Sequence, residues 1–331
     1  MLAAAVVLLL GMIAALVVGR FRVPISLGDV VEVLAAKLTG RASDIPPAVQ
    51  IVILNLRVPR VLAAVIVGAA LAMAGAAFQG LFRNPLASPD ILGVSSGGAL
   101  GAVLGIYLQL SLHEIALMSF AGGLLAVAIV YFAASRLAAR DPILVLVLSG
   151  VVIAALFSAG AGYVRYIADP TQDLPLMTYL LIGGLDRIRY VHLAAIVGPV
   201  ALGTAVLFVL RWRMNALSLP EEEARALGLP TGVLRTVIIV AATLLTAASV
   251  AISGIIGWVG LVVPHLARAL VGPDFSRLIP ASAIFGGGYL LLIDTLARSA
   301  SASETPLGIL TAVIGTPFFF WLLTRMQRTW S

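Results

Sequence analysis

The chain has 331 residues, of which 61% are hydrophobic and only 11% are charged, and its formal net charge is +6. Soluble domains carry about 25% charged residues. The composition therefore excludes an ordinary soluble enzyme, a disordered protein and a nucleic-acid-binding protein that works by bulk charge. The sequence contains no cysteine, which excludes disulfide frameworks, thiolate metal sites and cysteine nucleophiles.

Ten apolar segments follow one another along the chain. A membrane-spanning helix needs about 20 mainly apolar residues, because the hydrocarbon core is about 30 Å thick. The alternating pattern of a membrane β-barrel is absent. The sequence therefore predicts an all-α polytopic membrane protein with ten transmembrane helices in a single domain, residues 1–331. The expected spans are roughly 1–19, 61–81, 91–110, 115–135, 142–164, 191–210, 234–253, 255–271, 278–297 and 307–324.

The first apolar segment has no charged residue in front of it, so we interpret it as a span rather than a signal peptide. An even number of spans puts both termini on the same side of the membrane. With both termini inside, 11 of the 21 basic residues lie in or near inside segments. The positive-inside rule therefore leaves the orientation open. Most of the basic residues that would then lie outside belong to residues 20–60.

The single lysine is Lys37, which lies between Ala36 and Leu38. A Walker A phosphate loop needs Gly-Lys followed by Ser or Thr. The chain therefore has no ATP site of that kind.

Two of the expected spans carry small residues at helical spacing. Such a stripe lets a neighbouring backbone approach closely, and the alternative is a stripe that faces a translocation path or a second subunit. The stripes are Gly93, Gly97, Gly101 and Gly105 in one span, and Gly150, Ala154, Ser158 and Gly162 in another.

Ionisable residues within the expected spans are few. Asp294 and Arg298 are four residues apart, so they share a helix face and are expected to form an ion pair. The spans offer no chain of acids and histidines for proton relay, which argues against a proton-coupled transporter, although a sodium site built from carbonyls stays open. The three histidines are more than 70 residues apart and show no metal-ligand spacing.

Several separate motifs occur in order along the chain. Together they resemble the permease family of type II ABC importers, which take up iron–siderophores, haem and cobalamin, and the resemblance runs from about residue 50 to the C-terminus. The motifs are Leu56–Arg60, Gly80–Ala87, Leu92–Gly97, Gly257–His265 with Arg268, Asp294–Arg298 and Pro306–Gly308.

The resemblance implies ten spans in the bacterial inner (plasma) membrane, with both termini cytoplasmic. It implies a second copy of this chain, two cytoplasmic ATP-binding-cassette subunits and one periplasmic substrate-binding protein as partners, besides the lipid bilayer and without nucleic acid. The chain would be a transport subunit rather than an enzyme, with no cofactor of its own, because ATP and Mg²⁺ would bind the partner ATPase.

Arginines on the external rim are expected to dock the binding protein. The positions that match the family are Arg57, Arg60 and Arg298, and guanidinium groups suit bidentate carboxylate recognition. Alternatively, Arg57 and Arg60 only anchor a helix end among lipid headgroups.

Residues 217–228 are expected to form a short helix outside the membrane. Pro220 suits a first helical turn, three acids suit a helix N-terminus, and Gly228 suits a helix stop. The resemblance implies that this segment couples the permease to the ATPase, whereas a solvated charged loop is the alternative. The coupling residues would be Leu219, Pro220, Glu221, Glu222, Glu223, Ala224, Arg225, Leu227 and Gly228.

The resemblance also implies pathway and gate positions and an external re-entrant segment over residues 165–190. That segment departs from the family pattern at Leu180 and at Ile182–Gly184, which leaves the gate contacts open. The implied pathway and gate residues are Asn84, Pro85, Leu86, Ser149 and Gly150.

The sequence thus favours the permease subunit of an ATP-driven importer, with the pathway at a homodimer axis. We expect an iron complex as cargo, with ferric siderophore ahead of haem, then cobalamin, and molybdate last. An intramembrane enzyme would need a nucleophile–base pair or a metal triad at membrane depth, and the sequence offers neither. A stand-alone ion-coupled transporter is the rival from another class.

Overall fold

The computed structural model describes residues 1–19, 25–136, 142–219, 221–300 and 304–326. Within these ranges every regular element is a helix, which confirms the all-α prediction. In chain order they are α1 (Leu2–Val17), α2 (Leu27–Thr39), α3 (Pro47–Ile51), the π-helical turn η1 (Val52–Arg57), α4 (Val58–Leu81), the 3₁₀ turn η2 (Pro89–Leu92), α5 (Val94–Tyr107), α6 (Leu112–Arg136), α7 (Pro142–Ile167), α8 (Asp173–Ile182), α9 (Tyr190–Leu217), α10 (Glu221–Ala226), α11 (Thr231–Ser253), α12 (Val259–Val271), α13 (Phe275–Ala300) and α14 (Leu307–Met326).

Among the described residues, six helices are long and apolar enough to cross a membrane. They cover six of the ten expected spans, namely those near α4, α6, α7, α9, α11 and α13. The other four expected spans coincide with shorter apolar helices, α1, α5, α12 and α14, whose described apolar parts have 10–17 residues. The count of ten spans therefore stays a prediction.

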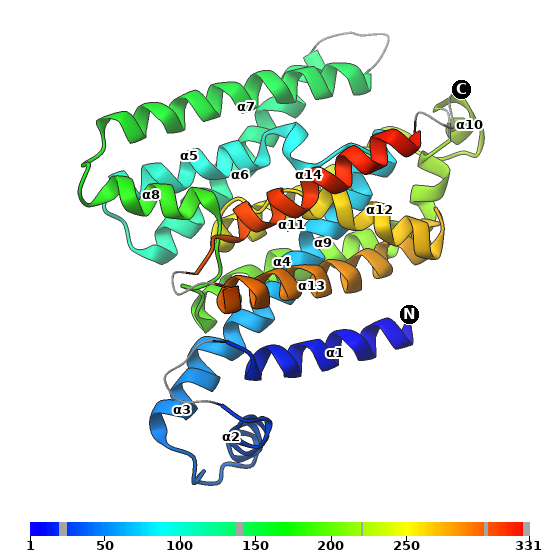
Figure 1. Ribbon diagram of the computed structural model, residues 1–331. Helices are drawn as coiled ribbons and strands as arrows, with labels where there is room; N and C mark the ends of the chain where they lie inside the picture. Colours follow the sequence, from blue (N-terminus) through cyan, green and yellow to red (C-terminus); the bar gives the residue numbers. More distant parts are fainter. Residues whose placement is uncertain (20–24, 137–141, 220, 301–303, 327–331) are drawn as a thin grey trace.

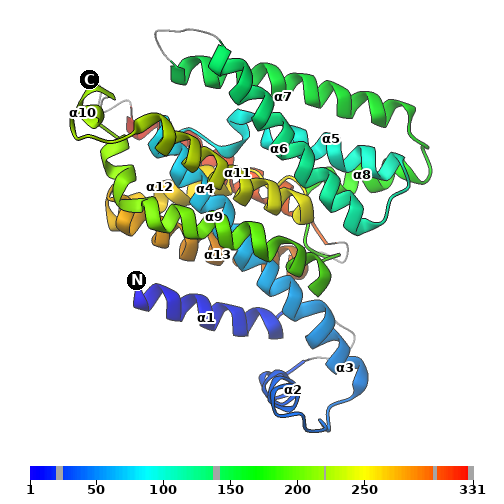
Figure 2. The same cartoon turned by 180° about the vertical axis from the view of Figure 1, so that it is seen from behind.

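The long helices lie side by side in a bundle (Figure 1). The group α5, α6, α7 and α8 forms one side, α1 with α2 and α3 forms the other edge, and α4 runs through the middle, as the view from behind also shows (Figure 2). The most apolar stretch of the α4 span is 78% buried, whereas that of α7 is only 22% buried. The apolar surface of α7 is therefore left for lipid or for another chain.

The two ends of the bundle differ. The start of α1, the end of α14 and helix α10 lie at one end, which we call the α10 end, and α3 and α8 lie at the opposite end, the α3 end (Figures 1 and 2). The start of α1 and the end of α14 thus lie on the side that carries α10.

Glycine contacts allow α4 to pack in the centre. A Cβ on Gly68 would lie 2.2 Å from the carbonyl oxygen of Gly286 in α13, and one on Gly75 would lie 1.8 Å from that of Gly260 in α12. The contacted atoms belong to the backbone of a neighbouring helix and cannot move aside. Only glycine therefore fits at these two helix crossings.

The stripe in α5 has the same use. A Cβ on Gly97 would lie 2.3 Å from the carbonyl oxygen of Gly122, and one on Gly101 would lie 2.1 Å from that of Met118, both in α6. These two glycines therefore serve helix packing, as one of the two interpretations of the stripe expects.

We expect Gly75→Ala to lower the yield of folded, monodisperse protein sharply, because overpacking against a rigid carbonyl costs about 1–3 kcal/mol or more. Gly162→Ala in α7 is the matched control, since no atom lies within 4 Å of the added Cβ. Size-exclusion profiles after detergent extraction and thermal unfolding measure both variants. Equal profiles for the two would show that the α4–α12 crossing tolerates a side chain.

Candidate functional site

Five charged residues from both halves of the chain meet at the α3 end. They are Arg57, Arg60, Asp294, Arg298 and Glu304, which we call the arginine cluster. The three arginines are only 6%, 8% and 7% exposed in chain order. The expected docking arginines thus come together, but they are buried and bonded inside the chain instead of projecting from a rim.

The sequence around Pro59 explains how two close arginines reach different partners. Proline has no N–H and its ring crowds the carbonyl four residues before it, which disturbs an α-helical turn. Here the chain takes the wider π-helical turn η1 immediately before Pro59, and the N–H of Val58 donates to the carbonyl of Ile53, five residues back. Arg57 then contacts α1 whereas Arg60 contacts α13.

Arg60 bridges two carboxylates. Its Nε donates to Oδ1 of Asp294 at 2.8 Å, and its Nη1 donates to Oε2 of Glu304 at 2.7 Å. Asp294 also forms the expected ion pair with Arg298, with 3.1 Å between Oδ2 and Nε. The sequence thus predicted one of the two arginine partners of Asp294 and missed the other.

Arg57 and Arg298 hold the end of α1. Between them they donate to every carbonyl oxygen of residues 15–19, for example Arg57 Nη1 to Val17 at 2.9 Å and Arg298 Nη2 to Ala15 at 3.2 Å. The last carbonyls of a helix lack partners within the helix and carry partial negative charge. Two guanidinium groups therefore satisfy hydrogen bonds and the helix dipole together.

The charges of the cluster nearly balance. Arg60 and Arg298 pair with the two carboxylates, and the positive charge of Arg57 lies against the negative end of α1. The side chain of Asp294 is 0% exposed, whereas that of Glu304 is 44% exposed. Glu304 is therefore the most exposed member of the cluster, and no periodicity in the sequence marked it.

Helix α10 protrudes at the opposite end of the bundle (Figures 1 and 2). Ala224 is buried against the bundle, whereas Glu222, Glu223 and Leu219 are exposed and Leu227 is 63% exposed. The protrusion ends at Gly228, whose φ of 75° favours glycine. The expected short helix is therefore present as α10. Pro220 lies outside the described residues, and Arg225 is exposed on the same protrusion.

A hydrogen-bonded corner fixes the helix that leads into α10. Nδ2 of Asn215, near the end of α9, donates to Asp274 Oδ1 at 2.7 Å, and its Oδ1 accepts from the Phe275 N–H at 2.8 Å. Hydrogen bonds from the Ser276 hydroxyl and from Asn215 hold the pKa of Asp274 below its usual value. The carboxylate therefore stays ionised and holds the end of α9 at the start of α13.

The expected gate loop between α4 and α5 is a tight turn at the α10 end. Asn84 Oδ1 accepts from the Leu86 N–H at 2.9 Å, which fixes the turn. Pro85 lines a cavity of about 510 Å³ together with Arg83 and Arg268. The structure therefore places this loop beside an opening that charged side chains help to line, at the end that carries α10.

The two expected pathway residues of α7 lie in different surroundings. Ser149 is half-buried, whereas Gly150 is buried, and a Cβ on Gly150 would lie 2.1 Å from the Ile91 carbonyl oxygen of η2. Gly150 thus serves packing within this chain, and a pathway role for Ser149 stays a prediction.

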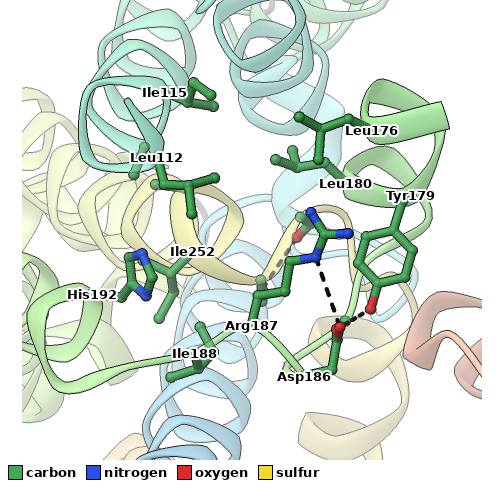
Figure 3. A pocket seen from close by; sticks show the side chains of 15 residues that line it. Leu112, Ile115, Leu176, Tyr179, Leu180, Asp186, Arg187, Ile188, His192 and Ile252 are labelled. Carbon is green, nitrogen blue, oxygen red and sulfur yellow. Dashed lines mark hydrogen bonds and ion pairs between the residues drawn. The ribbon is translucent and has the colours of Figure 1, made fainter. Parts of the chain in front are cut away.

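A small cavity lies behind α8 at the α3 end (Figure 3). It has a volume of about 70 Å³, enough for a few waters and far too small for a metal chelate. The Tyr179 hydroxyl donates to Asp186, and the Arg187 guanidinium lies 4.7 Å from the centre of the Tyr179 ring. Burial and the hydrogen bond to Asp186 raise the pKa of the Tyr179 hydroxyl, which therefore remains a donor. These contacts tie α8 to the loop that follows it.

The described residues include no group of three or more histidine or acidic side chains placed to hold a metal ion. What the structure brings together is instead an arginine cluster at one end, an exposed helix at the other, and a long apolar bundle between them.

Comparison with known proteins decides what such an arrangement is. Residues 7–325 match the FecCD transport family. The chain belongs to this family. It is therefore an ABC importer permease of the FecCD type, a transport subunit with several membrane-spanning helices, as the motifs indicated.

Two relatives and one solved structure show how far the similarity extends. The chain is 40% identical to the molybdate import system permease protein MolB of Haemophilus influenzae over 321 residues, which is 97% of this chain and 94% of that one. It is 41% identical to the hemin transport system permease protein HmuU of Yersinia pestis over 283 residues, 83% of this chain and 84% of that one. Other relatives are named for iron chelatin and cobalamin import.

The solved structure is an inward-facing conformation of a transporter assigned to the metal-chelate ABC type. It has a TM-score of 0.87 and 37% sequence identity, and the alignment covers 98% of each chain. The fold described above is thus shared over nearly the whole length.

Proposed function

We propose that this chain forms, with a second copy of itself, the translocation pathway of an ATP-driven importer for an iron complex, a ferric siderophore or haem. The observation that carries the proposal is that the exposed helix α10 and the arginine cluster lie at opposite ends of the bundle. ATP hydrolysis takes place on two partner subunits, and the α10 end faces the cytoplasm of a bacterium with both chain termini.

Helix α10 is the contact with the ATPase in this proposal. It presents Leu219 and Leu227 beside two acids on a short, anchored protrusion. Exposed leucines on such a protrusion suit insertion into a groove of a partner protein. The gate loop at residues 84–86 lies at the same end of the permease, where it would respond to movements of the ATPase.

The arginine cluster is the docking surface for a periplasmic substrate-binding protein in this proposal. Arg57 and Arg298 have a structural role in this surface, because their guanidinium groups donate hydrogen bonds to carbonyls at the end of α1. Arg60 meets the acidic group of the partner, because its second carboxylate, Glu304, is half-exposed and can be exchanged. An incoming carboxylate therefore competes with Glu304 for Arg60.

We expect Glu304→Gln to tighten binding of the substrate-binding protein about fivefold at low salt, since a partly exposed ion pair contributes up to about 1 kcal/mol. Arg60→Ala should abolish the salt-dependent part of the same affinity. Surface plasmon resonance on the permease in lipid discs measures both. If Arg60→Ala lowers the affinity but Glu304→Gln does not change it, only the competition between Glu304 and the incoming carboxylate is refuted. Unchanged affinity with Arg60→Ala would refute docking at the cluster.

ATP hydrolysis tests the proposed function as a whole. The chain is co-expressed with its candidate ATPase and placed in lipid discs, and the rate is measured with binding proteins loaded with ferric siderophore, haem, cobalamin or molybdate. Stimulation by a siderophore- or haem-loaded partner is the expected result. If no ATPase associates and an ion gradient drives transport by the chain alone, a stand-alone transporter replaces the importer.

Molybdate is the second candidate cargo. The relative named for molybdate import aligns over 97% of this chain, whereas the relative named for hemin aligns over 83%. The identities are nearly equal at 40% and 41%, so a relative named for oxyanion import is as similar to this chain as one named for hemin transport. Stimulation by the molybdate-loaded partner alone would decide for it.

A further inference from the structure

We propose that α2 lies in the membrane–water interface at the α3 end and binds the lipid surface through one apolar stripe. This 13-residue helix connects α1 to α3 and belongs to none of the expected spans. The proposal concerns the seating of the permease in the bilayer and holds whatever the cargo is.

The stripe consists of three exposed aliphatic side chains. Leu27 is 53%, Val31 58% and Leu38 87% exposed. Their spacings of four and seven residues place them on one line along a helix. The neighbouring line carries Val30 and Val33, which are buried against the bundle. The apolar arc of α2 is thus wider than the part that the bundle covers.

The opposite face of α2 is polar and already has partners. Oε1 of Glu32 accepts from the Ser43 hydroxyl at 3.2 Å and from the Asp44 N–H at 3.0 Å. The chain that follows α2 therefore returns over its acidic face and leaves the apolar stripe uncovered. A helix with one polar and one apolar face of this kind lies flat in a lipid interface.

Local signals define α2 at both ends. The Ser26 N–H donates to the Asp29 carboxylate at 2.7 Å and the Asp29 N–H donates to the Ser26 hydroxyl at 3.1 Å, which is a capping box. Gly40 ends the helix in the left-handed region with a φ of 68°. Both ends of α2 are therefore fixed by local structure, so Leu27, Val31 and Leu38 keep their positions along one line of the helix.

The position of α2 selects lipid as its partner. Figures 1 and 2 show α2 nearly end-on beside the end of α1, whereas α1, α13 and α14 run across the view. The helix thus lies across the direction of the spans, at the depth where α1 ends. Val30 and Val33 belong to the same buried cluster as Ala15 and Leu16 of α1, and α1 itself presents exposed aliphatic side chains at the edge of the bundle. A helix at that depth and on that edge lies over the lipid that surrounds α1.

The absence of cysteine from the sequence makes a direct test simple. Single variants Val31→Cys and Leu38→Cys carry a nitroxide label in the full chain, in discs of phosphatidylcholine and phosphatidylglycerol. Thr39→Cys is the matched control, because this exposed residue lies on the polar side of α2. Collisions with oxygen report lipid, and collisions with a water-soluble nickel chelate report solvent.

We expect the oxygen-to-nickel accessibility ratio at positions 31 and 38 to exceed that at position 39 several-fold. A ratio at 31 and 38 no higher than that at 39 would overturn the proposal. Protection of positions 31 and 38 from the nickel chelate that appears only after a binding protein is added would overturn the proposal as well, since the stripe would then contact a protein partner. All three sites are exposed, so the labels leave the packing of the bundle unchanged.

Discussion

Replacement of Asp294 by alanine is expected to lower the free energy of unfolding by about 3–5 kcal/mol, the usual cost of removing one partner from a buried ion pair. Its carboxylate is fully buried and faces Arg60 at 2.8 Å and Arg298 at 3.1 Å. Without it, two buried guanidinium groups face each other across the cluster. Arg298 also holds the end of α1, so we expect α1 to loosen first.

Unfolding in mixed detergent micelles measures this change, and protease cleavage within residues 15–30 reports on the end of α1. Glu304→Ala is the matched control, because it removes a carboxylate from the same cluster whose side chain is 44% exposed, and partly exposed pairs contribute about 0–1 kcal/mol. Equal destabilisation by the two variants would show that burial of Asp294 adds nothing to its contribution.

Local patterns in the sequence predicted the helices and one contact of the cluster. Long apolar runs mark helices that lie in a bilayer whatever their neighbours are, and the spacing of four between Asp294 and Arg298 predicts their pair within one helix. Proline, acids and glycine at fixed places likewise predicted α10. Each of these signals acts within a few residues.

Contacts between distant segments could not be predicted in this way. Arg60 reaches Asp294 across 234 positions, and Arg57 and Arg298 are buried where α1 ends beside them. The resemblance implied arginines on a rim, whereas their burial depends on where one further helix stops. Glu304 had no signal of its own, since a single acid in a connection is usually a solvated side chain.

We expect Leu227→Asp to weaken association with the ATPase by about 30-fold or more, since loss of a central apolar contact costs about 2 kcal/mol or more at an interface. Leu227 is 63% exposed on the α10 protrusion, so the fold of the permease should be unaffected. A charged group there cannot enter an apolar groove without losing its hydration. Co-purification and the ATPase rate in lipid discs measure the change.

Leu108→Asp is the matched control for this variant, because Leu108 is 57% exposed and directly follows α5 in a different part of the chain. The control should retain full association with the ATPase. If both variants bind the ATPase as the unmodified chain does, the contact lies elsewhere at the α10 end, and the 510 Å³ opening beside Arg83 and Arg268 is the next surface to change. If Leu227→Asp binds normally but loses transport, α10 transmits motion without supplying affinity, which would separate coupling from assembly in this permease.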